Sequence, residues 1–230
     1  MRRKHESPDS VFSEPHLQKP VQRQDASPLD SVWMEPLQST EDAARGRQLY
    51  RDWLLEQQSK QNPLKTWSRT FYLSLLAGPL AILTALFTQH PGAGILLLVV
   101  AGPVIEEIGK ILLPLMVMEK NPAKFDSRIQ LIVCAVTGGL AFASIENLLY
   151  LHVYIQDVTP GLIHWRWTVC VFLHTGCSFI AGLGLAKSWK ESVSKSQPPQ
   201  FETALPLIIT AVVIHGSYNF LALFLNSVFE

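Results

Sequence analysis

The sequence lacks the signatures of several common protein classes. It has only three cysteines, an odd number without metal-site spacing, so we expect no disulfide framework and regard them as small apolar fillers. Lysine and arginine form no basic stripe suited to a phosphate backbone, so we expect no nucleic-acid partner. No segment repeats along the chain, which argues against solenoid and other repeat architectures.

The most prominent feature that is present is a series of long apolar runs. Five segments are each close to the ~20 residues that an α-helix needs to cross a bilayer. They are Phe71–Thr88, Gly94–Met118, Ile129–Ile155, Leu162–Lys187 and Ala204–Val228. We therefore predict an all-α fold over residues 70–230, a polytopic transmembrane helix bundle with about five spans in a lipid bilayer. The sequence leaves its oligomeric state open.

The N-terminal part of the chain differs from the rest. Residues 1–40 are rich in proline, serine, glutamine and charge, with too little apolar surface to offset the entropy of ordering, so we predict a mostly disordered tail. Over residues 41–69 we predict a juxtamembrane amphipathic helix, at Glu41–Gln58, and a linker, because apolar residues from Leu49 to Leu54 recur at helical spacing. The basic residues at the N-terminus precede no apolar stretch, so we expect no cleavable signal peptide.

Basic residues are distributed unevenly among the connections between the predicted spans. Lysine and arginine occur before the first span, between the second and third, and between the fourth and fifth, whereas the remaining connections contain only Arg166. Because lysine and arginine in short loops stay on the cytoplasmic side, we predict a cytoplasmic N-terminus and a C-terminus outside. Trp165 and Trp167 then fall at the outer membrane interface, where tryptophan is enriched.

The second predicted span contains three charged residues, Glu106, Glu107 and Lys110. Each costs roughly 2.5–3.5 kcal/mol near the bilayer centre on insertion scales, so their presence indicates chemistry or transport at membrane depth. An ion pair that fixes helix packing is the plainer alternative. Glu106 and Lys110 are four residues apart on one helix face, which favours a pair between them and leaves Glu107 freer to act as a general base.

Polar residues at comparable depth occur in the other spans. They are Glu146, Asn147 and Tyr150 in the third span, His174 in the fourth, and His215 and Asn219 in the fifth. With a rise of about 1.5 Å per residue, one polar chamber could collect side chains from four helices. Glutamate and histidine are ligands of hydrolytic zinc sites, in which another acid serves as base. The same groups can activate water and stabilise an oxyanion without a metal, and the residues leave both mechanisms open.

Motifs of other intramembrane protease chemistries are missing. The sequence has no His-Glu-x-x-His motif, and its only aspartates after the first span, Asp126 and Asp157, lie in predicted loops, which excludes an aspartyl dyad. Ser178 lies four residues from His174 in the same span, so we do not expect a serine nucleophile.

Four motifs occur in order between Gly94 and Phe220. They are Glu106-Glu107-x-x-Lys110, Phe142-Ala-x-x-Glu146-Asn147-x-x-Tyr150, His174 in a span that Arg166 leads, and His215-Gly-x-Tyr218-Asn219. This set resembles the PrsW family of intramembrane proteases, which is related to the CAAX-protease and bacteriocin-processing superfamily. The resemblance implies a polytopic endopeptidase in a prokaryotic cytoplasmic membrane. Its substrate would be a membrane-associated protein, as the named member of the family cuts a regulatory anti-sigma factor.

The resemblance also implies roles for the motif residues. Those with an implied catalytic role are Glu106, Glu107, Glu146, His174, His215 and Asn219, with Lys110, Asn147 and Tyr150 in support. The two adjacent glutamates would activate water, and the two histidines would bind a metal such as zinc or polarise the scissile carbonyl. The tentative metal ligands are Glu146, His174 and His215, and Asn219 would stabilise the oxyanion. A zinc-dependent and a metal-free mechanism both stay open.

Two hypotheses from other functional classes compete with proteolysis. Glutamates and histidines at mid-membrane also relay protons, which would suit a proton- or ion-coupled transporter, although no inverted repeat is visible. A non-catalytic membrane scaffold of the same fold is the third hypothesis. Replacing Glu107 by glutamine would leave a scaffold functional, abolish a protease, and uncouple a transporter without any protein being cut.

Overall fold

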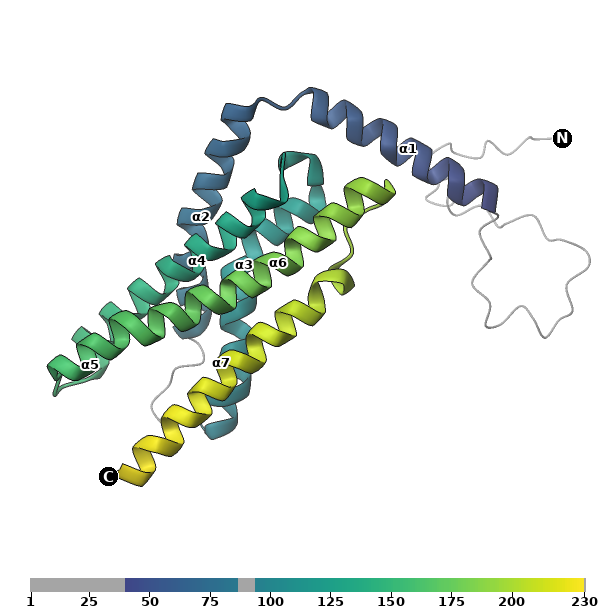
Figure 1. Ribbon diagram of the computed structural model, residues 1–230. Coiled ribbons are helices and arrows are strands. Elements are labelled where there is room, and N and C mark those ends of the chain that lie inside the picture. The colour runs from purple at the N-terminus through teal and green to yellow at the C-terminus, as the bar shows by residue number, and fades with distance from the viewer. Residues whose placement is uncertain (1–39, 87–93, 230) are drawn as a thin grey trace, which may run out of the picture. The chain divides into compact units, whose positions relative to one another are not determined.

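The computed structural model describes residues 40–86 and 94–229, and these residues form helices and short connections without any strand (Figure 1). The all-α fold predicted from the sequence is confirmed for this part of the chain. The tail predicted to be disordered, residues 1–40, lies outside the described residues apart from Thr40. Contacts divide the chain at Asp42, and residues from Ala43 onward form the compact unit that contains the helix bundle.

Seven α-helices and three π-helical segments make up most of this unit. The α-helices are α1 Thr40–Ser59, α2 Pro63–Leu86, α3 Gly102–Lys120, α4 Arg128–Leu149, α5 Pro160–Trp165, α6 Val171–Lys195 and α7 Phe201–Phe229, and a 3₁₀ turn, η4, covers Pro122–Lys124. The π-helical segments are η3 Leu97–Ala101, η5 Tyr150–Tyr154 and η6 Arg166–Cys170. Segment η3 leads directly into α3, and η5 directly follows α4. Segment η6 joins α5 to α6, so α5, η6 and α6 form one long helix.

Three helices in the described part of the chain are long and apolar enough to cross a membrane. They are Arg128–Tyr154, Pro160–Lys195 and Phe201–Phe224, which correspond to the last three predicted spans. The first two predicted spans lie on α2 and on η3 with α3. The charged residues of α3 set it apart from the three more apolar helices, and α2 is described only as far as Leu86. A count of about five spans is consistent with these helices.

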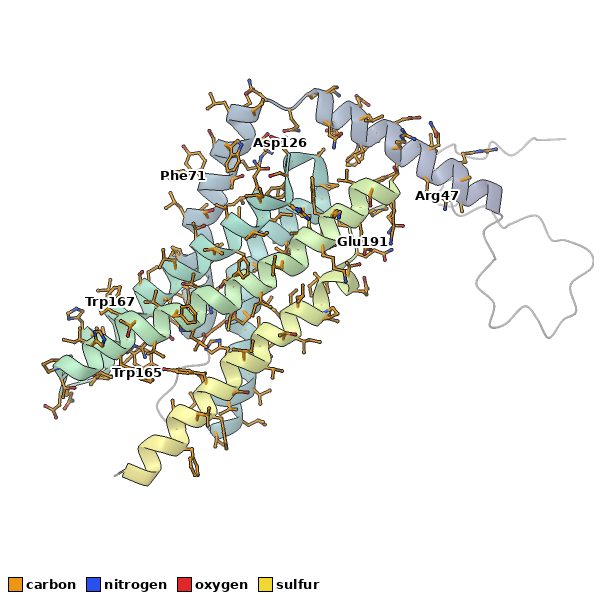
Figure 2. All side chains as sticks on the ribbon, in the orientation of Figure 1. Arg47, Phe71, Asp126, Trp165, Trp167 and Glu191 are labelled. Carbon is orange, nitrogen blue, oxygen red and sulfur yellow. The ribbon has the colours of Figure 1, made fainter. Side chains whose placement is uncertain are left out.

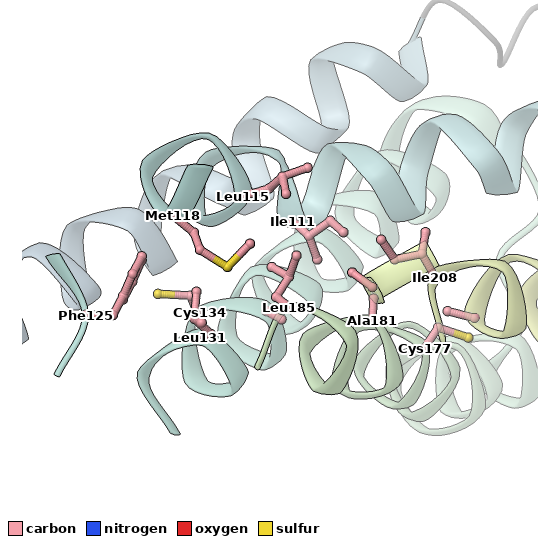
Figure 3. Packing of buried hydrophobic residues seen from close by; sticks show 13 residues of the cluster. Ile111, Leu115, Met118, Phe125, Leu131, Cys134, Cys177, Ala181, Leu185 and Ile208 are labelled. Carbon is pink, nitrogen blue, oxygen red and sulfur yellow. The ribbon is translucent and has the colours of Figure 1, made fainter. Parts of the chain in front are cut away.

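The bundle is built around α4 and α6. Helix α4 packs against α2 and α6, α7 packs against α6, and α3 contacts α2, α4, α6 and α7. In Figure 1, α4, α6 and α7 run alongside one another. Figure 3 shows the apolar cluster between these helices, which includes Ile111, Leu115, Met118, Phe125, Leu131, Leu185 and Ile208. All three cysteines are free thiols and are buried.

The connection between α4 and α5 lies at the opposite end of the bundle from the connection between α3 and α4. Figure 2 shows Trp165 and Trp167 near α5 at one end, whereas Asp126 and Glu191 lie toward the other. Helix α1 lies where the sequence predicts a helix over Glu41–Gln58. It buries Leu54, and its Tyr50 hydroxyl lies 3.4 Å from the Ser192 Oγ of α6.

Close contact between α4 and α6 depends on glycine at position 139. A methyl group there would lie 2.6 Å from the Ser178 Cβ and 3.0 Å from the His174 carbonyl oxygen, both on α6. Such distances are below van der Waals contact, so only glycine lets the two backbones approach as they do. The contact fixes the height of His174 relative to α4.

We predict that Gly139→Ala lowers the free energy of unfolding by about 1–3 kcal/mol, the usual cost of overpacking. Unfolding of the purified protein in sodium dodecyl sulfate would measure it. Gly176→Ala in α6 is the matched control, because no atom lies within 4 Å of a methyl group there. Adding Ser178→Gly should restore most of the loss, since it removes the side chain that the new methyl meets. Equal stability of Gly139→Ala and Gly176→Ala would contradict this account of the contact.

Candidate active site

A buried ion pair on α3 lies at the centre of the polar residues. Lys110 Nζ donates to Glu107 Oε1 at 2.7 Å, and both side chains are 0% exposed. His215 Nδ1 from α7 lies 2.8 Å from the same oxygen. A carboxylate only accepts hydrogen bonds, so His215 donates from Nδ1 and carries its lone pair on Nε2. Glu107 thus joins α3 to α7.

The pairing partner of Lys110 differs from the sequence-based prediction. The prediction that Lys110 pairs with Glu106 is wrong, because the ammonium bonds Glu107. Residues three apart are also neighbours on a helix face, and long helical side chains point back toward the N-terminus. Glu107, rather than Glu106, is therefore the glutamate that the lysine holds.

Lys110 also orients a histidine on α6. Its Nζ lies 2.9 Å from His174 Nδ1 and 4.4 Å from the ring centroid of Phe142. An ammonium group has donors only, so His174 accepts at Nδ1 and donates from Nε2 to Glu146 Oε2 at 3.1 Å. Phe142 packs beside His174, with 5.0 Å between ring centroids. The lysine thereby fixes both the orientation and the tautomer of His174.

Glu146 finds its basic partner across the bundle, in Arg166. The guanidinium donates from Nη2 to Glu146 Oε2 at 2.8 Å and from Nε to Asn147 Oδ1 at 2.9 Å. Asn147 returns a bond to the Arg166 carbonyl at 2.8 Å, and Tyr150 lies under the guanidinium at 3.9 Å. The sequence predicts Arg166 in an outer connection and assigns it no role in the site. A sequence feature that could have identified it is that this connection contains no other lysine or arginine.

Glu106 is in a different situation from its neighbour. Its side chain is buried, and its Oε2 has no hydrogen-bond partner among the described residues. The Oε2 of Glu107 also lacks a partner there, but the Oε1 of Glu107 is bound by both Lys110 and His215. The nearest cationic or imidazole nitrogen to Glu106 Oε2 is His215 Nε2, at 3.7 Å, which is too long for a hydrogen bond. An unpaired buried carboxylate oxygen is costly unless water, a proton or a metal ion completes it. Glu106 therefore marks a position at which an exogenous group can bind.

A cavity of about 390 Å³, called here the central cavity, lies in front of these residues. Its polar lining is Glu106, Glu146, Arg166, His174, Tyr218 and Asn219, and Tyr150 also lines it. All three π-helical segments contribute to its wall, η3 through Leu98, η5 through Tyr150 and η6 through Cys170. Segments of π-helix are frequent at functional sites, because the extra residue in the turn changes where side chains point.

The structure brings the sequence-predicted site residues together from α3, α4 with its continuation η5, α6 and α7. Five of them line the central cavity: Glu106, Glu146, Tyr150, His174 and Asn219. The other four lie behind the lining and contact residues of the site: Glu107, Lys110, Asn147 and His215.

Tyr218 and Asn219 of α7 both line the central cavity. Tyr218 was quoted in a motif but received no role, and its hydroxyl accepts from Trp165 Nε1 at 2.8 Å and lies 3.3 Å from Cys170 Sγ. Asn219 Nδ2 donates to the Leu98 carbonyl at 3.0 Å. One N–H of the Asn219 amide is therefore engaged with the backbone of η3, and the other stays available.

Glu106, His174 and His215 form a buried group that could hold a metal ion. Each offers one donor atom, and the three atoms lie within 4.8 Å of one another. Ligand atoms about 2.1 Å from a tetrahedral zinc ion are roughly 3.4 Å apart, so the unpaired Glu106 Oε2 and the His215 lone pair fit such a group. To bind the ion through Nε2, His174 would have to give up its bond to Glu146 and move its proton to Nδ1, which also ends the bond that Nδ1 accepts from Lys110. The predicted ligand set contained Glu146 in place of Glu106, and Glu146 is here held by Arg166 and His174.

Comparison with known proteins identifies the family. The model of a family described as PrsW family intramembrane metalloprotease matches residues 63–230, which include all the helices that build the site. Comparisons with curated proteins and with solved structures found no match. The matched region contains the buried glutamate and histidine group and the apolar helices of an integral membrane protein. The chain therefore belongs to the PrsW family of intramembrane metalloproteases.

Proposed function

We propose that the protein is an endopeptidase that hydrolyses a peptide bond in a membrane-associated protein, and that Glu106 takes the proton of the attacking water. The observation that carries this proposal is that Glu106 lines the central cavity while its Oε2 lacks a hydrogen-bond partner among the described residues. A general base needs a free lone pair within reach of the water. The Oε2 of Glu107 also lacks a partner among the described residues, but Glu107 does not line the central cavity, and Lys110 and His215 both bind its Oε1.

Glu107 and Lys110 act as positioning residues in this proposal. Glu107 holds His215 in the tautomer with a lone pair on Nε2, and Lys110 holds His174. Arg166 in turn holds Glu146, which completes the site as the acceptor for His174. The charged groups around the central cavity are thus arranged before substrate binds, which is what electrostatic catalysis requires.

The reaction proceeds with the protons in balance. Glu106 accepts a proton as the water oxygen bonds to the scissile carbonyl carbon, and the carbonyl oxygen becomes an oxyanion. The free N–H of Asn219 and the hydroxyl of Tyr218 line the central cavity and can donate to that oxyanion. Glu106 then gives its proton to the leaving nitrogen as the C–N bond breaks.

We propose zinc as the metal of the group formed by Glu106, His174 and His215, because imidazole and carboxylate are the usual ligands of hydrolytic zinc sites. A bound zinc ion would lower the pKa of water and polarise the scissile carbonyl. Glu106 has two carboxylate oxygens, so it can contribute one as a ligand and keep the other as a proton acceptor.

We propose a regulatory membrane protein as the substrate, like the anti-sigma factor that the resemblance suggests. The expected membrane is a prokaryotic cytoplasmic membrane, with the N-terminus inside and the C-terminus outside. The separation of the basic loops from Trp165 and Trp167 supports this orientation. The connections between α3 and α4 and between α6 and α7 would then lie on the cytoplasmic side.

Glu106→Gln and Glu107→Gln should fail in different ways. Glu106→Gln should lower hydrolysis by about 100-fold or more while the protein stays folded, because it removes the base and the proposed metal ligand but no ion pair that holds the helices together. Glu107→Gln should lower stability by about 3 kcal/mol or more, because it leaves the buried ammonium of Lys110 without its counter-charge. Thermal unfolding in detergent would separate the two effects. Full hydrolytic activity of Glu106→Gln would contradict its role as the base.

The same variant can reveal the substrate. Membrane-protein fragments should be compared by mass spectrometry between cells that produce the wild type and cells that produce Glu106→Gln at equal abundance. Fragments that occur only with the wild type are expected, and their ends would give the cut site. A wild-type protein that releases no fragment and cuts no added membrane protein, but moves protons across vesicles, would be a transporter instead.

Metal content should follow the ligand group. The purified wild type should contain about one zinc ion per chain by elemental analysis, and His215→Ala and Glu106→Gln should each lose most of it. Glu146→Gln is the comparison that separates the two ligand sets, and it should retain the metal if Glu106 is the carboxylate ligand. A metal-free wild type that still hydrolyses its substrate would show a glutamic mechanism.

A further inference from the structure

The central cavity is separated from the lipid-facing surface by a thin apolar wall. Leu98 of η3 and Leu223 of α7 line the central cavity, and the same two residues line a groove on the outside of the bundle. This outer groove is completed by Ile95, Phe220 and Phe224, which are 62%, 48% and 55% exposed. Two leucine side chains are therefore the shared boundary of the central cavity and the outer groove.

A hydrogen bond crosses this wall. Asn219 Nδ2 donates to the carbonyl of Leu98, and the sequence explains why that carbonyl needs a partner. The N–H of Gly102 donates to Leu97, and the next backbone nitrogen belongs to Pro103, which has no hydrogen to donate. A carbonyl without a partner is costly in a membrane, so the side chain of Asn219 caps it.

The Asn219 amide and the Leu98 carbonyl are the donor and the acceptor that a peptide backbone can bind. A transmembrane helix must unwind where it is cut, and its freed N–H and C=O groups then need partners inside the membrane. Once the Asn219 bond opens, the Leu98 carbonyl can accept from a substrate N–H, and the Asn219 amide can donate to a substrate C=O. A lipid acyl chain offers neither group and could not replace the broken bond.

We propose that the wall between η3 and α7 is the lateral entrance of the protease, and that its occupant is the unwound transmembrane segment of the substrate. The segment arrives in the outer groove and passes between Leu98 and Leu223. The Asn219–Leu98 hydrogen bond then breaks, and both groups form hydrogen bonds to the backbone of the substrate instead. The proposal rests on the proposed function, because it assigns the route by which the substrate of that same site enters.

Side-chain size at the wall should affect the cutting of embedded substrates most. Leu98→Ala and Leu223→Ala should raise the rate for a full-length membrane substrate in proteoliposomes by about threefold to tenfold, because they make opening easier. The substrate is the protein found by the fragment comparison. A soluble peptide with the same cut sequence does not need the wall to open, so the ratio of the embedded-substrate rate to the soluble-peptide rate should rise in these variants. Leu98→Trp and Leu223→Trp should lower the same ratio.

Leu96→Ala and Leu221→Ala are the matched controls. Leu96 directly precedes η3 and Leu221 lies on α7, and both are exposed, but neither lines the central cavity. They should leave both rates unchanged. The entrance lies elsewhere if the Leu98 and Leu223 variants change neither rate, change both rates equally, or behave like the controls.

A distance measurement tests the entrance without any proteolysis. Spin labels at Leu96→Cys and Leu221→Cys should give a distance distribution that gains a longer component when Asn219→Ala removes the bond across the wall. The three native cysteines are buried, and the labelled wild type controls for any reaction at them. An unchanged distribution would overturn the proposed role of the Asn219 bond. Opening with no cleavage of either substrate form by the wild type would instead contradict the proposed function.

Discussion

The fully buried ammonium of Lys110 is the group on which the arrangement of the site depends. Left without partners at this depth, it would cost several kcal/mol, so the surrounding helices must supply acceptors. Glu107 supplies one from α3, His174 supplies another from α6, and the Phe142 ring of α4 faces the charge. Each partner is itself held from another helix, so satisfying one cation fixes the relative positions of α3, α4, α6 and α7.

This constraint divides the two adjacent glutamates between two roles. Glu107 is bonded to Lys110 and His215, and therefore serves the structure of the site. Glu106 is turned toward the central cavity, where no described residue completes its Oε2. Adjacent positions on a helix point about 100° apart, so one turn of α3 can carry both an anchor and a free carboxylate. The histidines are held by the same ion pair, because Glu107 binds Nδ1 of His215 and Lys110 binds Nδ1 of His174.

Helix geometry extends this arrangement to the walls of the central cavity. Close packing at Gly139 sets the depth of His174 against α4, and the π-helical segments bring Leu98, Tyr150 and Arg166 to the lining. Pro103 leaves a carbonyl of η3 without a main-chain donor, and Asn219 of α7 provides the missing hydrogen. The residue that the resemblance assigns to the oxyanion thus also joins two elements of the wall, which links substrate access to the chemistry.

Much of this protein could be derived from its sequence by itself. Long apolar runs require helices in a bilayer, and charges such as Glu106 and Lys110 within such a run indicate function, because both follow from local composition and the cost of burial. The pairing of those charges could not be derived. On a helix, Lys110 can pair with Glu107 at i−3 or with Glu106 at i−4. The pairing with Glu107 depends on His215, which also binds Glu107 and is 108 positions away in the sequence. Arg166 likewise became a site residue only when η6 placed it beside Glu146, and contacts between helices far apart in the sequence leave no local pattern.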